Sequence, residues 1–220
     1  MRKRTLAVTA ALMLISACSA GDTDDGSRLA QESKPDGAAG PETGPEIEGP
    51  NLQAVLDFAN PSRCEWGAPA ETIFGQKAVF DDNDQLQPGT IKIPGVADPV
   101  TATLSRPDEE YPDYVEADLD FKGEWLGLQV VGLTDAFFEE SGGMFGRGIR
   151  FDAPIAEVSS ALIEAGFEVN ADGSERAFAP DRPDQPVDPD ELMGEDFVST
   201  SITVQGSETV FLCNYVFAGI

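Results

Sequence analysis

The chain has 220 residues, 41 % of them apolar, with 40 acidic residues against 14 basic ones and no histidine. This length is enough for one domain of ordinary size with a hydrophobic core. A formal net charge of −26 is repelled by phosphate groups, so nucleic-acid binding is excluded. Without histidine, a Ser-His-Asp centre, a Cys-His centre and a histidine-ligated zinc site are excluded as well.

The chain begins with a targeting signal. Residues 2–4 are basic, and residues 5–17 carry no charge and are mostly apolar. An apolar run of this length is too short to cross a bilayer as a helix, so it is typical of a signal peptide. The segment ends in Ile15-Ser16-Ala17-Cys18, an aliphatic residue and two small residues before a cysteine.

This ending resembles the lipobox of bacterial lipoproteins. The resemblance covers residues 1–18 alone and implies cleavage before Cys18, a diacylglycerol on its sulfur and acylation of the new amino terminus. Ser19 follows the cysteine where a retained inner-membrane protein would have Asp, which resembles an outer-membrane lipoprotein facing the periplasm. The alternative is an ordinary secretory signal cleaved after Ala17 or Ala20, with Cys18 incidental.

The mature chain divides into a linker and one domain. Residues 18–50 follow the signal peptide of residues 1–17 and are rich in Gly, Pro and acids, with no aromatic residue, so they predict a disordered acidic linker. Residues 51–220 contain the aromatic and branched residues that a core needs. We therefore expect a single acidic domain held away from the membrane by its linker.

The first half of this domain predicts two short helices and then strands. Leu52, Val55, Leu56 and Phe58 have helical spacing, and residues 68–75 predict a second helix. Alternation of apolar and acidic residues over 114–121 predicts a strand with one buried face. Residues 100–104 and 125–133 predict neighbouring strands.

The second half predicts a short strand over 149–151, a helix opened by Pro154, and two hairpins. One hairpin would turn at Asp172-Gly173, and the other at Gln205-Gly206-Ser207. Helices that precede and interrupt antiparallel strands indicate an α+β fold, with two or three short helices and an antiparallel sheet in a single domain.

Cys64 and Cys213 are the two thiols that remain once Cys18 is acylated. In an exported chain the simplest expectation is one disulfide between them, closing the domain across a loop of about 150 residues. Two buried free thiols are the alternative.

Residues that could carry chemistry are few. Acidic residues cluster over 81–84 and 181–196, but neither segment has the spacing of a calcium loop, so we expect no metal site and no cofactor. Paired carboxylates could support glycan hydrolysis, although the sequence singles out no pair. The glycine-rich segment 142–148 reads as a flexible turn, and its Phe145 and Arg147 form a possible contact with a partner.

These observations favour an envelope lipoprotein with a non-catalytic binding or assembly role. Its expected partners are the lipid bilayer, through acylated Cys18, and another envelope protein. A lipoprotein that binds a cation or small ligand, and a carboxylate-based glycan hydrolase, remain the alternatives, so whether the protein is an enzyme stays open.

Overall fold

The computed structural model describes residues 47–139, 145–179, 185–188, 192 and 195–216. All of them belong to one compact unit, Gly44–Ile220. The signal peptide, Cys18 and the linker up to residue 46 lie outside the described residues, so lipidation and linker disorder stay predictions.

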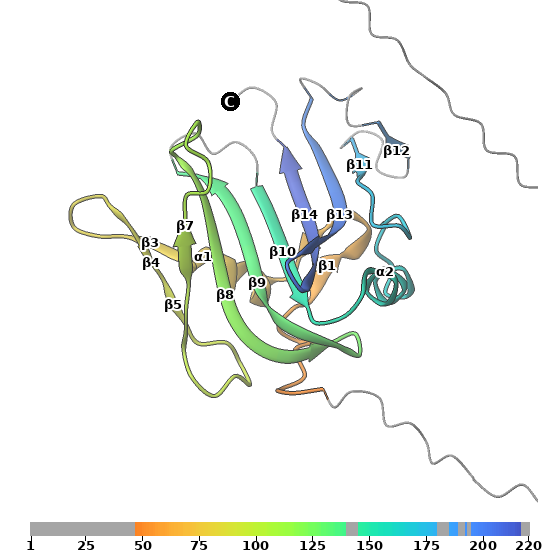
Figure 1. Cartoon of the computed structure of the whole chain (residues 1–220), viewed down its shortest axis with the longest axis horizontal. Coiled ribbons are helices and arrows are strands. Elements are labelled where there is room, and N and C mark those ends of the chain that lie inside the picture. Colours follow the sequence, from red (N-terminus) through yellow and green to blue (C-terminus); the bar gives the residue numbers. More distant parts are fainter. Residues whose placement is uncertain (1–46, 140–144, 180–184, 189–191, 193–194, 217–220) are drawn as a thin grey trace, which may run out of the picture. The chain divides into compact units, whose positions relative to one another are not determined.

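An antiparallel sheet of eight strands, in the order β12-β11-β13-β14-β10-β9-β8-β7, dominates the structure (Figure 1). Its strands are β7 (Thr103–Ser105), β8 (Tyr114–Trp125), β9 (Leu128–Phe138), β10 (Phe145–Phe151), β11 (Arg176–Phe178), β12 (Pro186–Val187), β13 (Phe197–Gln205) and β14 (Glu208–Val216). Every neighbouring pair is antiparallel. Short turns join β8 to β9 and β13 to β14, whereas β10 and β14 are neighbours in the sheet but not in the chain.

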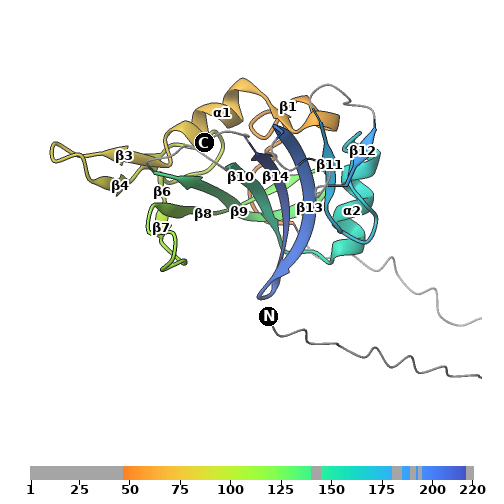
Figure 2. The same ribbon diagram turned by 90° about the horizontal axis from the view of Figure 1, so that it is seen from above.

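Three two-stranded sheets and three short helical segments surround the large sheet. The small sheets pair β1 (Phe58–Asn60) with β2 (Glu65–Trp66), β3 (Ala78–Phe80) with β4 (Leu86–Pro88), and β5 (Thr90–Ile91) with β6 (Val100–Thr101). The helical segments with described bounds are α1 (Ala68–Gly75), α2 (Ile155–Glu164) and a 3-10 turn at Pro61–Arg63. Both ribbon views show the β3–β4 hairpin projecting as an arm from the rest of the unit (Figures 1 and 2).

The expected α+β class is wrong, because the structure is mostly β, with 46 % strand and 14 % helix. The strands are much longer than the sequence pattern suggested: β8 has 12 residues and β9 has 11. The antiparallel sheet was expected, and the helices at 68–75 and after Pro154 are present as α1 and α2. Helices form too little of the structure to make a layer of their own.

The predicted helix over residues 52–58 is also absent. Leu52, Val55 and Leu56 are buried as expected, but this segment makes only one turn before β1 begins at Phe58. The backbone N–H of Leu52 donates to Glu124 O at the end of β8, and Glu124 N–H donates to Pro50 O. This strand-edge pairing competes with a helix for the same backbone groups, and it prevails.

Two of the predicted strands are not formed as expected. Residues 125–133 do not form one strand, because Leu126 and Gly127 both have positive φ and make the tight turn between β8 and β9. Asp172-Gly173 is a turn, but residues 167–169 are not a strand, and β11 pairs with β13. The hairpin at Gln205-Gly206-Ser207 is confirmed as β13–β14.

One face of the large sheet is covered, and we call it the covered face. Its central row is apolar across five strands: Leu119, Leu133, Ile149, Phe211 and Ile202 face one another in register and are all buried. The residues that cover it come from the segment before β1, from α1 and from α2: Leu52, Leu56, Phe74, Val158 and Leu162, each fully buried. Figure 2 shows α1 and β1 lying over the sheet on this side.

Candidate functional site

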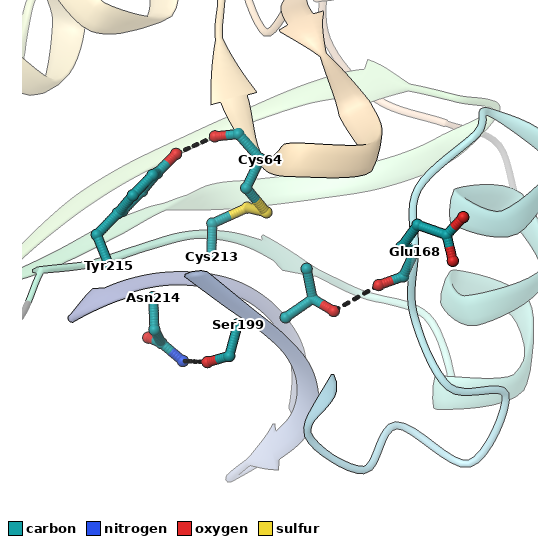
Figure 3. Close-up of a disulfide and its surroundings, with 7 residues drawn as sticks. Cys64, Glu168, Ser199, Cys213, Asn214 and Tyr215 are labelled. Carbon is teal, nitrogen blue, oxygen red and sulfur yellow. Dashed lines mark hydrogen bonds between the residues drawn. A yellow bond between two sulfur atoms is a disulfide. The ribbon is translucent and has the colours of Figure 1, made fainter. Parts of the chain in front are cut away.

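The predicted disulfide between Cys64 and Cys213 is present and buried, with the two Cα atoms 5.8 Å apart (Figure 3). It joins the loop after the first 3-10 turn to the covered face of β14, so it ties the N-terminal cover to the last described strand. The hydroxyl of Tyr215, two residues further along β14, donates to the backbone carbonyl of Cys64. This cystine belongs to the core, where it fastens the covering segment.

Arg147, predicted as a contact on a flexible loop, lies in β10 on the covered face. Its Nη1 atom is 2.8 Å from Glu71 Oε1 of α1, and its Nε is 3.5 Å from Asp135 Oδ2 of β9. Its guanidinium also lies 5.0 Å from the centre of the Phe74 ring. Arg147 therefore holds α1 to the sheet, and these internal contacts explain its position without a partner.

Phe145, the other predicted contact residue, opens β10 and pairs in register with Tyr215. The preceding glycine-rich residues up to 144 lie outside the described residues. Within β10, Gly146 and Gly148 are strand residues between β9 and β14, so this half of the expected turn is part of the sheet.

The acidic segment 81–84 forms the tip of the β3–β4 arm. The Asp81 carboxylate accepts hydrogen bonds from the backbone N–H groups of Asn83 and Gln85 and from the Gln87 side chain. The backbone hydrogen bonds hold the pKa of Asp81 below its usual range. Asp81 thus shapes the hairpin turn, and Asp84 takes the positive φ that this turn requires.

The second acidic segment, 181–196, is described only in part. Its Val187 and Leu192 pack with Ala177, Ala179 and Phe197 in a small second core. Within the described ranges, no three acidic or cysteine side chains converge in a way that could hold a metal ion.

On the opposite side of the large sheet, over β8, β9, β10 and β14, the described side chains are mostly polar or small and half-buried, and we call this region the open face. Cross-strand register places its residues in rows. One row reads Glu116, Ala136, Gly146, Asn214 and Ser199, and the next reads Asp118, Thr134, Gly148, Leu212 and Ser201. Each row therefore has a carboxylate at the β8 end and small residues in the middle.

A third row on the open face carries an arginine. Arg150 of β10 reaches Asp120 across Gly132 of β9, and its Nη1 atom lies 3.4 Å from Glu208 Oε2 of β14. A Cβ atom at Gly132 would lie 2.4 Å from the Arg150 Nη2 atom, so only glycine leaves room for this side chain. Arg150 is thus neutralised within its own row, and the other two rows keep their carboxylates.

A trough of about 160 Å³ crosses these two rows. Its lining consists of Tyr114, Glu116, Asp118, Thr134, Ala136, Gly146, Gln205, Leu212 and Asn214. No basic side chain is among them, and neither Glu116 nor Asp118 has a basic partner among the described residues. The trough is therefore a concave surface with unneutralised negative charge at its β8 end.

The phenol of Tyr114 borders the acidic end of the trough. Its hydroxyl donates to Glu116 Oε1 at 3.2 Å. Burial, followed by the charge of Glu116, raises the pKa of Tyr114 to about 12. Tyr114 therefore stays a neutral donor, and it positions the Glu116 carboxylate.

The opposite end of the trough presents another acceptor. The Ser199 hydroxyl donates to Glu175 Oε1 at 2.6 Å, because a carboxylate accepts only. Ser199 then accepts from Asn214 Nδ2 at 3.4 Å, which leaves Asn214 Oδ1 facing the strand position of Gly146. Figure 3 shows Asn214 and Ser199 on the side of the strands away from the disulfide.

A larger cavity, of about 390 Å³, lies beside the turn between β8 and β9. Ile47 and Glu48, the first two described residues, form part of its wall, so its extent depends on the chain before residue 47. Its polar groups are largely paired with one another: Lys122 Nζ is 2.6 Å from Glu48 Oε2, and the Gln129 side chain bonds the backbone of Glu48. The trough is the better candidate, because all its residues belong to the strands of the sheet or their ends and its two carboxylates have no basic partner among the described residues.

Comparisons with protein-family models, with curated proteins and with solved structures find no match for this chain. Across the described residues, no helix is long and apolar enough to cross a membrane. The candidate site is therefore argued from its own geometry.

Sequence reasoning identified none of the trough residues as a site. The alternation over 114–121 placed Glu116 and Asp118 on the wet face of a strand, which is confirmed. What the sequence lacked was the register, which brings Ala136, Gly146 and Asn214 into line with Glu116. The small residues at every second position of β10, Gly146 and Gly148, were the available signal.

Proposed function

We propose that this protein is a lipid-anchored protein of the bacterial cell envelope that binds another envelope protein through the open face of its sheet. The anchor is acylated Cys18, and residues 19–46 tether the domain on the periplasmic side of the outer membrane. The observation that carries the binding role is the trough, a concave surface on the open face whose two carboxylates have no basic partner among the described residues.

A sheet face normally packs against another layer or is filled by large polar side chains. Here Ala136, Gly146 and Gly148 form the middle of the face. The side chains of Asn214, Leu212 and Thr134 lie close over the two glycines. The hollow that remains is the trough, where a partner side chain can enter, and specificity can come from the carboxylates at one end and the amide at the other.

Anchoring is tested by fractionating cells that produce Cys18→Ala. We expect this variant to leave the membrane fraction or to accumulate as an uncleaved precursor, because no cysteine is available for acylation. Ser19→Ala is the matched control and should fractionate as the parent does. A Cys18→Ala protein that matures and fractionates normally would show that the anchor is wrong.

Binding is tested by placing a photo-reactive amino acid at Thr134 in the trough and, as a control, at Ile163 of α2, whose side chain is 48 % exposed. In cells, Thr134 should give one defined adduct and Ile163 should not. Filling the trough with Ala136→Phe should abolish an adduct formed from a neighbouring position, Asp118, while Ile163→Phe leaves it unchanged. Equal labelling from Thr134 and Ile163 would contradict the proposal.

A further inference from the structure

We infer that the trough receives a lysine or arginine side chain from an extended basic segment of the partner protein. This inference rests on the proposed function and names the chemistry of its partner. It starts from charge: Glu116 and Asp118 face the trough from alternate positions of β8, and no described base neutralises them. The whole chain reinforces the same sign, with a formal net charge of −26.

The acceptor groups that line the trough favour a ligand that donates hydrogen bonds. Two carboxylates accept at the β8 end, and Asn214 Oδ1 is an acceptor at the β14 end, where one N–H of the same amide donates to Ser199. The Tyr114 hydroxyl is already committed to Glu116. The Thr134 hydroxyl and the Gln205 amide can donate as well as accept, so the charge of the two carboxylates decides. A ligand that brings ammonium or guanidinium N–H groups matches these carboxylates, and an anion is repelled by them.

The apolar floor of the trough favours a basic side chain over a small cation as the ligand. Between the two polar ends lie Ala136, Gly146 and Leu212, which offer an apolar surface. Lysine and arginine bury an aliphatic stem along such a surface and keep their charged head in a polar environment. A metal ion gains nothing from that floor, and the described acids do not converge to hold one.

The volume of the trough and its direction across the strands favour a protein segment over a free small molecule as the ligand. A volume of about 160 Å³ is well below the several hundred Å³ that a pocket for a small organic ligand usually has. The trough crosses four neighbouring strands, from β8 through β9 and β10 to β14. At ~4.8 Å between strands its length is on the order of 14 Å, so a side chain can lie along it while its backbone passes over the open face.

The test uses the full-length mature lipoprotein in nonionic detergent micelles and a fluorescently labelled hexalysine peptide as the probe. The binding constant is measured by fluorescence anisotropy at physiological salt, for the parent and for the double variant Glu116→Gln/Asp118→Asn. We expect about tenfold weaker binding for the double variant, since two partly buried ion pairs are removed.

A matched control removes the same formal charge elsewhere. Asp82→Asn at the tip of the arm and Glu164→Gln at the end of α2 are exposed and lie outside the trough. This control should weaken binding less than twofold. Equal weakening in both double variants would overturn the inference, because the attraction would then be spread over the whole acidic surface.

A variant that binds hexalysine more tightly is also needed, because weaker binding in the other variants could result from misfolding. Thr134→Glu adds a carboxylate to the floor beside Asp118, its register partner, and should tighten hexalysine binding about threefold. Spermine, which has the same charge chemistry without a backbone, should bind clearly more weakly than hexalysine. Spermine binding as tightly as hexalysine would overturn the assignment of the trough to a protein segment.

The outcomes also separate this inference from the proposed function. If the adduct from Thr134 persists while the double variant Glu116→Gln/Asp118→Asn binds hexalysine as tightly as the parent, the open face binds a partner but no basic side chain enters the trough. If Thr134 gives no specific adduct, the proposed function itself fails.

Discussion

Asp135 and Arg147 face each other in register on the covered face of the sheet, with Arg147 Nε 3.5 Å from Asp135 Oδ2. Lys77, directly before the β3–β4 arm, completes the cluster with its Nζ atom 2.6 Å from the same oxygen and 4.3 Å from the centre of the Phe137 ring. Only 2 % of the Asp135 side chain is exposed. One buried carboxylate thus connects the sheet, the base of the arm and, through Arg147, helix α1.

Asp135→Asn should lower the free energy of unfolding by about 3 kcal/mol, because it leaves Lys77 packed against the sheet without its counter-charge and Arg147 with Glu71 alone. Asp118→Asn, on the open face, is the control and should change it by less than about 0.5 kcal/mol. Urea denaturation followed by tryptophan fluorescence measures both. A loss as small as that of the control would mean that the cluster contributes nothing to the fold.

The pH dependence of the same site has a defined sign. Burial raises the pKa of Asp135, and it outweighs the opposing effects of Lys77 and Arg147. A raised pKa favours the folded state in acid, so this contribution is fully present below the unfolded value of 3.8 and is lost as pH rises through the folded pKa. The parent should therefore gain stability relative to Asp135→Asn as the pH falls through the folded pKa of Asp135, and a difference that stays flat from neutral pH into acid would contradict this.

Gly132→Ala should destabilise the domain by about 2 kcal/mol, as overpacking in a tight site does. The new Cβ would lie 2.4 Å from Leu119 O as well as from Arg150 Nη2, and the backbone oxygen cannot move aside. Gly75→Ala, at the end of α1 with nothing within 4 Å of the new Cβ, is the control and should be neutral or slightly stabilising. Thermal unfolding compares the two, and similar midpoints would show that Arg150 has another position available.

The contrast between these residues shows how far the sequence could predict this structure. Alternation found the faces of β8, and Pro154 and Gly166 marked the limits of α2, because these are local signals. The β8–β9 turn was missed because Leu126, an apolar residue in an apolar run, occupies a left-handed conformation. The residue type leucine does not predict a left-handed conformation.

The candidate site was harder to predict than the fold, for a physical reason. Arg147 looked like a loop residue because it stands among glycines, but its strand pairs with β9, the preceding strand, and with β14, much later in the chain. The same long-range register aligns Glu116 with Asn214 across Ala136 and Gly146. Register depends on the packing of the whole covered face, so local sequence patterns cannot supply it.

Replacing either disulfide cysteine should cost a similar amount of stability. The bond closes a loop of 149 residues, for which chain entropy gives an upper limit of about 5 kcal/mol. Cys64→Ser, Cys213→Ser and the double variant should therefore unfold at nearly the same urea concentration under oxidising conditions, since all three lack one and the same bond. Losses that add in the double variant would mean that the two sulfurs contribute separately.

Tyr114 reports on the acidic end of the trough. Its pKa of about 12 lies above the ordinary value of 10.0, first through burial and then through Glu116. The stabilisation that accompanies this shift is present below pH 10 and is lost as pH rises through about 12. Glu116→Gln removes the neighbouring charge, so Tyr114 should ionise at a lower pH.

Ultraviolet absorbance of the phenolate measures this titration, and Tyr114→Phe identifies which transition belongs to Tyr114. The matched control is Asp82→Asn, which removes one charge at the arm tip and should leave the Tyr114 transition in place. Tyr215, whose pKa is raised mainly by burial on the covered face, should be unaffected by Glu116→Gln. If Glu116→Gln leaves the Tyr114 transition unmoved, the two side chains are not in contact in solution, and the acidic end of the trough is not held in the geometry that the binding of a basic side chain requires.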